Sequence, residues 1–145
     1  MGQISDLLRQ EDLRDVRLLV IDADGRIDRD LALLHERLAD DAAIVIDDVD
    51  GQVAAWPDGN GWFVDQKHRI ASSLVQSFCE AGWLVPAGVT GQTGFFRKGP
   101  EPFAGDECAT RALEAYRELV FTHARPSGSD LRGRTHDFTA ATGGQ

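Results

Sequence analysis

Two apolar segments, separated by one helical segment, constrain the fold most. Residues 16–22 (VRLLVID) form a near-continuous apolar run, which is typical of a strand buried on both faces in a parallel sheet, and residues 42–48 (AAIVIDD) form another. Between them, residues 27–39 carry aliphatic side chains at helical spacing. These are Ile27, Leu31, Leu34 and Leu38. The pattern predicts a βαβ unit with a right-handed crossover.

The rest of the chain adds a loop, two helices and a hairpin. Residues 50–63 (DGQVAAWPDGNGWF) predict a long loop, and such loops often carry function. Residues 67–82 predict an amphipathic helix capped by Gly82. Residues 83–98 predict a hairpin, because two short strand patterns flank a Gly-containing turn. The aromatic residues of the loop, either as a substrate lid or as packing, are Trp56, Trp62 and Phe63.

A last helix and a polar tail complete the expected organisation. Residues 105–123 predict a helix with four side chains turned inward, namely Ala109, Leu113, Tyr116 and Val120. From Arg125 onward the chain is rich in Gly, Ser, Thr and charge, which predicts disorder over 125–145. The expectation is therefore one folded domain over residues 1–124, which is long enough for a real core.

The composition and charge limit the classes of partner that the chain is expected to bind. Hydrophobic residues make up 42% of the chain and charged residues 27%, as in ordinary globular proteins. The net charge of −9 argues against nucleic acid and against an anionic membrane surface. The sequence shows neither a signal peptide nor an apolar run long enough to span a bilayer. We therefore expect a cytoplasmic protein in which Cys79 and Cys108 are reduced thiols.

Acidic residues follow both predicted strands. Asp22 and Asp24 follow the first, and Asp47 and Asp48 follow the second. The carboxyl ends of neighbouring parallel strands meet at one edge of a sheet, where ligands bind in open α/β folds. Carboxylates held this close repel one another unless a divalent cation such as Mg²⁺ relieves the charge. The alternative is that these acids only cap helices and form turns.

Two families of acidic strand-end enzymes resemble parts of this pattern. IDADG at 21–25 resembles the DxDG motif of haloacid-dehalogenase phosphatases, in which Asp22 would be the nucleophile and Asp24 the acid. Only one helix separates the two acidic motifs here, whereas that fold places further strands between them. IVIDDVD at 44–50 resembles the opening strand of response regulators, but no phosphoacceptor Asp lies around 86–98.

A third resemblance covers residues 2–98. GQISDLL (2–8), IDAD (21–24), DLALLHERL (30–38) and IDD (46–48), followed by a helix and a hairpin, resemble in order and spacing the C-terminal half of class I S-adenosylmethionine-dependent methyltransferases. The catechol and caffeoyl-CoA O-methyltransferases and their bacterial relatives are the nearest type. The resemblance implies an α/β, Rossmann-like half-sheet, mostly parallel with a C-terminal antiparallel hairpin, and helices on both faces.

The same resemblance implies a site and its ligands. S-adenosylmethionine would be the cofactor, Mg²⁺ would assist, and a small molecule would accept the methyl group. Asp22 would be catalytic and lie near the sulfonium, and the metal ligands would be Asp22, Asp47 and Asp48. The residues flanking the cofactor would be Gln3, Ile4, Ser5 and Asp22. The metal would lower the pKa of the substrate hydroxyl and orient it for attack.

Two departures from the family leave two hypotheses. No nucleotide-binding half precedes Gly2, and the position of the catechol-type base is Gly25, next to Arg26, which stays protonated. The chain could be a methyltransferase that needs a partner half. It could instead be a non-catalytic interaction module derived from one. Both hypotheses predict a homo-oligomer or a partner that covers the exposed edge of the first strand.

Overall fold

A four-stranded sheet is the centre of the molecule. The computed structural model of the protein describes residues 13–23, 25–58 and 61–122, which form a mixed α/β fold. The sheet has the order β1-β2-β6-β5. Its strands are β1 (Val16–Ile21), β2 (Leu38–Ile46), β5 (Leu84–Thr90) and β6 (Thr93–Lys98). β1 pairs with β2 in parallel, and β6 is antiparallel to both of its neighbours, so β1 and β5 are the edge strands.

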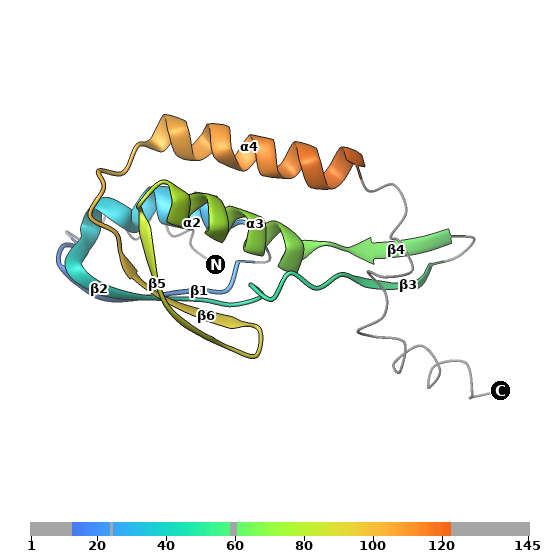
Figure 1. Ribbon diagram of the computed structural model, residues 1–145, viewed down its shortest axis with the longest axis horizontal. Helices are drawn as coiled ribbons and strands as arrows, with labels where there is room; N and C mark the ends of the chain where they lie inside the picture. Colours follow the sequence, from blue (N-terminus) through green and yellow to red (C-terminus); the bar gives the residue numbers. More distant parts are fainter. Residues whose placement is uncertain (1–12, 24, 59–60, 123–145) are drawn as a thin grey trace.

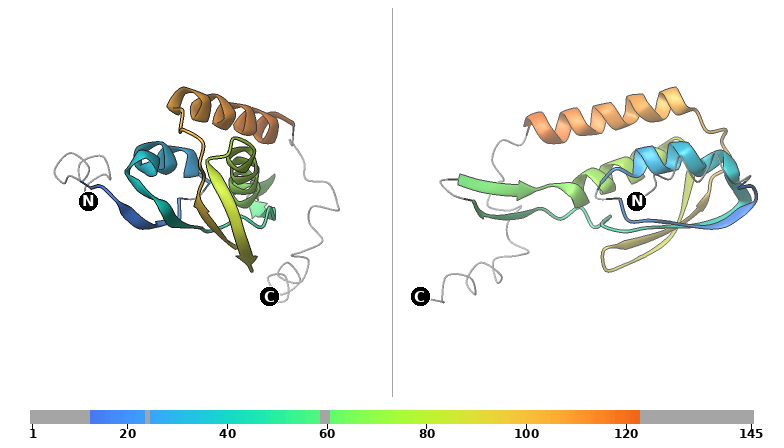
Figure 2. Two further views of the ribbon diagram at one scale, coloured as in Figure 1. Left: turned by 60° about the vertical axis from the view of Figure 1, so that its left-hand side comes forward. Right: turned by 180° about the vertical axis from the view of Figure 1, so that it is seen from behind.

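The described helices lie on one side of this sheet. α2 (Ile27–Leu34) and α3 (Lys67–Glu80) cover one face, and α4 (Gly105–Thr122) packs against both of them from the side away from the sheet (Figure 1). The turned views show the same three layers (Figure 2). A two-stranded ribbon, β3 (Ala54–Asp58) and β4 (Gly61–Asp65), extends away from the sheet beyond the start of α3.

Regular apolar spacing accounts for the covered face. The buried residues of α2 are Ile27, Leu31 and Leu34, and those of α3 include Ala71, Leu74, Val75 and Phe78. They pack against alternate residues of the strands, since successive strand side chains point to opposite faces. The strand residues in this core include Leu19, Ile21, Ile44, Ile46, Leu84 and Phe96. Their burial provides most of the driving force for this fold.

Gly82 ends α3 as the sequence predicts. Its φ of 75° is in the left-handed region, which favours glycine. The backbone N–H of Trp83 then donates to the carbonyl of Phe78 at 3.0 Å, which satisfies a carbonyl in the last turn of α3. Trp83 lies in the core, and its indole N–H donates to the carbonyl of Pro102 at 3.1 Å. The cap therefore directs the chain from α3 straight into β5.

The predicted order of strand, helix, strand, helix, hairpin and helix is confirmed, and so is the α/β class. The prediction of a long loop is wrong, because β3 and β4 form a ribbon there. Pro57 pairs opposite Trp62 in this ribbon, in which every strand is an edge strand and a missing backbone N–H is tolerated. The predicted helix 27–39 ends early: a 3₁₀ turn (His35–Arg37) follows α2, and Leu38 is already in β2.

Two predicted orientations are also wrong. Ala109 and Leu113 of α4 are exposed, and the inward residues are instead Cys108, Ala112 and Ala115. α4 packs on helices rather than on the sheet, and small side chains permit that close approach. Tyr116 is half-buried, and the side chain of Val120 lies outside the described residues.

Helices were also expected on both faces of the sheet. Within the described ranges they cover one face only, so β1 is not buried on both faces. Three of the four strands run in the same direction, yet β1 and β2 are the one adjacent parallel pair of the described sheet, because β6 lies between β2 and β5. The expected disordered tail, 125–145, lies outside the described residues.

Candidate functional site

The acidic residues singled out in the sequence follow neighbouring strand ends. The backbone N–H of Asp47 donates to the carbonyl of Ile21 at 3.0 Å, which fixes the end of β2 beside the end of β1. Asp22 follows immediately and is exposed, whereas Asp48 is buried. The predicted neighbours of the cofactor, Gln3, Ile4 and Ser5, lie outside the described residues, as does Asp24.

Asp48 is held by donors from the protein. Its φ of 61° is in the left-handed region, and its side chain is only 8% exposed. Lys67 Nζ lies 2.9 Å from one carboxylate oxygen, and His68 Nε2 lies 3.0 Å from the other. Gln92 Nε2 also donates to Asp48 at 3.1 Å. Three elements therefore meet on this carboxylate: the end of β2, the first turn of α3, and the turn between β5 and β6.

His68 lies between two carboxylates. Its Nε2 faces Asp48, and its Nδ1 lies 2.7 Å from Asp50 Oδ1. Both ring nitrogens therefore lie within hydrogen-bond distance of a carboxylate oxygen, and an ionised carboxylate only accepts hydrogen bonds. Asp50 belongs to the acidic strand end, whereas Lys67, His68 and Gln92 were not among the residues that the sequence indicated for this site. Their one signal was position, since Lys67 and His68 open the helix that follows the acidic strand end.

Asp47 is held by donors from the turn between β5 and β6 and from the start of β6. Its carboxylate accepts from the Thr93 hydroxyl at 2.8 Å and from Gln92 Nε2 at 3.4 Å. These donors and the backbone N–H of Asp48 lower the pKa of Asp47, with the Thr93 hydroxyl as the largest cause. Asp47 and Asp48 therefore share the Gln92 donor, but their other partners differ: the Thr93 hydroxyl contacts Asp47, whereas Lys67 and His68 contact Asp48.

This arrangement bears on the predicted metal site. Among the described residues, no group of three or more His, Cys, Asp or Glu side chains is placed to hold a metal ion. The cluster of Asp48, Asp50, Lys67 and His68 instead joins strand end to helix start through charge-assisted hydrogen bonds, which are stronger than neutral ones. Its evident contribution is to fix the geometry of this edge.

The uncovered face of the sheet is the second candidate site. Two rows of residues cross all four strands on this face, as the strand registers define. One row is Val20, Val45, Phe95 and Gly88, and the other is Leu18, Ala43, Arg97 and Val85. Several of these side chains are exposed: Leu18 by 59%, Val20 by 63%, Val85 by 43% and Phe95 by 41%. We call these two rows the open face.

The open face has charge at both ends. Asp47 and Thr93 lie beyond the Val20 row, at the carboxyl end of β2. Arg97 lies in the other row, towards the amino end of β2, opposite Ala43. The face is therefore apolar across its middle, with Asp47 beyond one row and Arg97 within the other.

In comparison with known proteins, no family model, no curated protein and no solved structure matches the chain. The described residues form a mixed α/β protein whose helices cover one face of the sheet. None of the described helices is both long enough and apolar enough to cross a bilayer.

Proposed function

We propose that this chain is a self-associating interaction module, in which the open face of the sheet binds the same face of a second copy. The observation that carries the proposal is the pair of rows, apolar except for Arg97, on a sheet face that the described helices leave uncovered. Monomeric proteins rarely expose contiguous apolar patches of large size, and such patches mark interaction surfaces.

Charge complementarity favours a second copy as the occupant. Two identical sheets can meet face to face about a two-fold axis that runs along the Val20 row, perpendicular to the strands. The axis reverses strand direction, so the row with Arg97 of one copy faces the row with Asp47 and Thr93 of the other. Packed sheets lie about 10 Å apart and within about 30° of alignment, which an arginine side chain can bridge. Homodimers with two-fold symmetry are also the commonest oligomers.

The size of the open face predicts a weak, reversible dimer. Four strands about 4.8 Å apart, each about six residues long at about 3.3 Å per residue, give on the order of 400 Å² of plan area per copy. Two copies approach the lower limit of specific interfaces, which is on the order of 1,000 Å² in total. Association should therefore depend on protein concentration.

Sedimentation of the full chain over a wide concentration range tests the proposal. We expect the wild type to shift from monomer to dimer as concentration rises. Leu18→Asp should remain monomeric, because it places an unpaired charge within the apolar rows. Leu113→Asp is the matched control: Leu113 is 50% exposed on α4, away from the sheet, so this variant should dimerise as the wild type does.

A charge exchange tests the predicted orientation. Arg97→Glu and Asp47→Lys should each weaken the dimer, and the double variant should restore part of the lost affinity, because the two positions face each other across the axis. A chain that stays monomeric at every concentration would overturn the proposal. Equal weakening by Leu18→Asp and Leu113→Asp would place the interface elsewhere. Far-ultraviolet circular dichroism of each variant shows whether it has folded.

Methyl transfer is the second candidate function. The observation that favours it is that the strand ends carrying Asp22 and Asp47 lie side by side, as that interpretation requires. The Rossmann-like half-sheet with S-adenosylmethionine and Mg²⁺ as cofactors stays a prediction. Titration calorimetry with S-adenosylhomocysteine, with and without Mg²⁺, tests it. Saturable binding that Asp22→Asn weakens would support this function, and no binding by the folded chain would remove it.

A further inference from the structure

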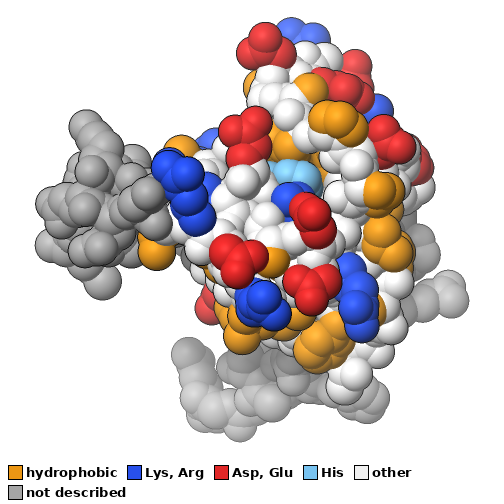
Figure 3. Space-filling model, turned by 90° about the vertical axis from the view of Figure 1, so that its left-hand side faces the viewer, with side chains coloured by type: hydrophobic (Ala, Val, Ile, Leu, Met, Phe, Trp, Pro, Cys, Tyr) orange, Lys and Arg blue, Asp and Glu red, His pale blue; other side chains and the backbone are white. Residues whose placement is uncertain are grey.

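A cavity at the end of the molecule opposite the Asp48 cluster has no role in the proposed dimer. It has a volume of about 630 Å³ and lies between the 3₁₀ turn after α2, the start of β2 and the segment that leaves β6. Figure 3 views this end and shows acidic side chains around the hollow. The lining residues used below are His35, Glu36, Asp40, Lys98, Glu101 and Phe103. The volume suits a small molecule.

His35 provides a hydrogen-bond acceptor in the wall of this cavity. The residue is only 2% exposed, and its Nε2 lies 3.2 Å from the carbonyl oxygen of Trp83. A carbonyl only accepts, so Nε2 carries the proton. Burial lowers the pKa of His35, helped by the nearby charge of Lys98, which favours the neutral ring, and in the tautomer that donates from Nε2 the Nδ1 carries a lone pair. No donor to Nδ1 occurs among residues 13–23, 25–58 and 61–122.

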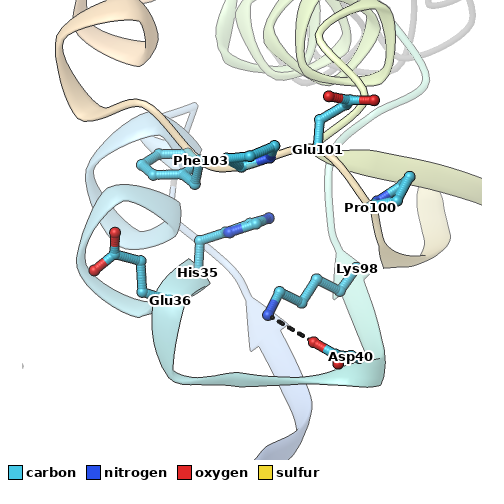
Figure 4. A pocket seen from close by; sticks show the side chains of 9 residues that line it. His35, Glu36, Asp40, Lys98, Pro100, Glu101 and Phe103 are labelled. Carbon is cyan, nitrogen blue, oxygen red and sulfur yellow. Dashed lines mark hydrogen bonds and ion pairs between the residues drawn. The ribbon is translucent and has the colours of Figure 1, made fainter.

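Aromatic packing holds the His35 ring in place. Phe103 stacks on it with ring centroids 4.8 Å apart and an angle of 25° between the planes. Figure 4 shows the His35 ring between Phe103 on one side and Lys98 on the other. The acceptor is therefore fixed before any ligand arrives, which reduces the entropy lost on binding.

The lining carries an excess of negative charge. Its carboxylates belong to Glu36, Asp40 and Glu101, and its one basic side chain is Lys98. The Lys98 ammonium already donates to the carbonyl of Leu38 at 2.8 Å and lies 3.5 Å from Asp40 Oδ1 (Figure 4). Within the described part of the chain, neither Glu36 nor Glu101 has an ion-pair partner. They lie on opposite sides of His35.

We propose that this cavity binds a small aliphatic amine, with one ammonium group donating to His35 Nδ1 and the carboxylates of Glu36 and Glu101 balancing its charge. An ammonium group has three donors and no acceptor, which matches a neutral imidazole lone pair between carboxylates. The apolar edge of Phe103 and the neighbouring prolines would contact the methylene groups of such a ligand.

Titration of the full chain with putrescine, followed by backbone amide chemical shifts, tests the proposal. We expect saturable shifts at residues 99–103 and at His35. Butanediol is the matched probe, because it has the same carbon chain with neutral hydroxyl groups, and it should give no saturable shift. Shifts of equal size and affinity with both probes would overturn the proposal, as would the absence of saturable binding by putrescine.

Substitutions show whether putrescine binding depends on the carboxylate charges rather than on an intact fold alone. The double variant Glu36→Gln and Glu101→Gln should weaken putrescine binding on the order of tenfold, since it removes charge-assisted contacts at exposed positions. Glu114→Gln, an exposed change on α4 outside the cavity, is the control and should bind as the wild type does. His35→Gln should also weaken binding. Unchanged affinity in the double variant would overturn the proposal even if His35→Gln fails to fold.

Discussion

The two faces of the central sheet are built from the same strands but differ in burial. On the covered face, Ile21 is 2% exposed and Ile44 and Ile46 are completely buried. On the open face, Leu18 and Val20 alternate with residues of that core along β1, yet each exposes more than half of its surface. One face is closed by α2 and α3, and the other is left apolar without a described cover.

An apolar composition does not by itself determine which side chains of a strand are buried. VRLLVI is apolar at nearly every position, which suits burial on both faces, but the described helices all lie on one side. The unused apolar character of the other side is what leads us to propose a second copy. The following predictions test how unlike the two faces are, beginning with the largest effect.

Loss of covered-face packing should have the largest effect. Ile44→Ala removes a completely buried side chain of the core, and it should lower the free energy of unfolding by about 3 to 4 kcal/mol. Urea denaturation of dilute protein measures the change. Leu18→Ala, which removes a 59% exposed side chain from the open face, is the control and should have a much smaller effect. Equal losses would mean that the two faces are equally covered.

The neighbouring acids Asp47 and Asp48 extend the comparison to polar groups. Asp48→Ala should lower the free energy of unfolding by about 2 to 3 kcal/mol, because it removes the carboxylate that the Nε2 of buried His68 and the ammonium of Lys67 contact. Asp47→Ala, on the open side, should cost clearly less. Asp48→Asn keeps an acceptor and tolerates the left-handed backbone, so it should fall between them. A larger loss for Asp47→Ala would contradict this ranking, which thermal and urea unfolding measure.

Much of the fold follows from local pattern. Four features were predictable from the sequence: β1, α3, the β5–β6 hairpin and the Gly82 cap. Each depends on the spacing of apolar residues or on turn-forming residues within a short segment. Leu38 was misassigned because its position continues the period of Ile27, Leu31 and Leu34, while its partner is Val16 in β1. Which face the helices cover depends on packing between distant segments, and no local pattern encodes it.

The candidate site was predictable only in part. Strand-end acids are visible in sequence, and Asp22, Asp47 and Asp48 do follow neighbouring strand ends. The donors that neutralise Asp48 come from α3 and from the β5–β6 turn, far away in sequence. A carboxylate pattern therefore predicts where negative charge gathers, but it does not show whether a metal or the protein itself balances that charge.

The buried His35 gives the covered side a dependence on pH. Burial lowers its folded-state pKa, Lys98 adds to this, and the Trp83 carbonyl and Glu36 oppose it. The unfolded chain therefore binds more protons as pH falls below the ordinary histidine value of about 6.5. The contribution of His35 to stability is complete above that pH and declines as pH falls towards the folded pKa. Between the unfolded and folded pKa values of His35, the free energy of unfolding should fall more steeply with decreasing pH in the wild type than in His35→Gln. Urea unfolding at a series of pH values measures this. Parallel curves would show that His35 is not the source.

The smallest expected effect is the sharpest test of the open face. Val20→Thr keeps shape and β-branching and replaces a methyl group with a hydroxyl at a position that is 63% exposed. In dilute protein it should change the free energy of unfolding by no more than about 0.5 kcal/mol. The same substitution at Val75, which is 9% exposed in α3, should cost about 1 to 3 kcal/mol, because its hydroxyl loses water in the core. If Val20→Thr costs as much as Val75→Thr at concentrations where the chain is monomeric, the face is covered within a single chain. The proposed dimer then loses its premise, since no apolar surface remains for a second copy to bury.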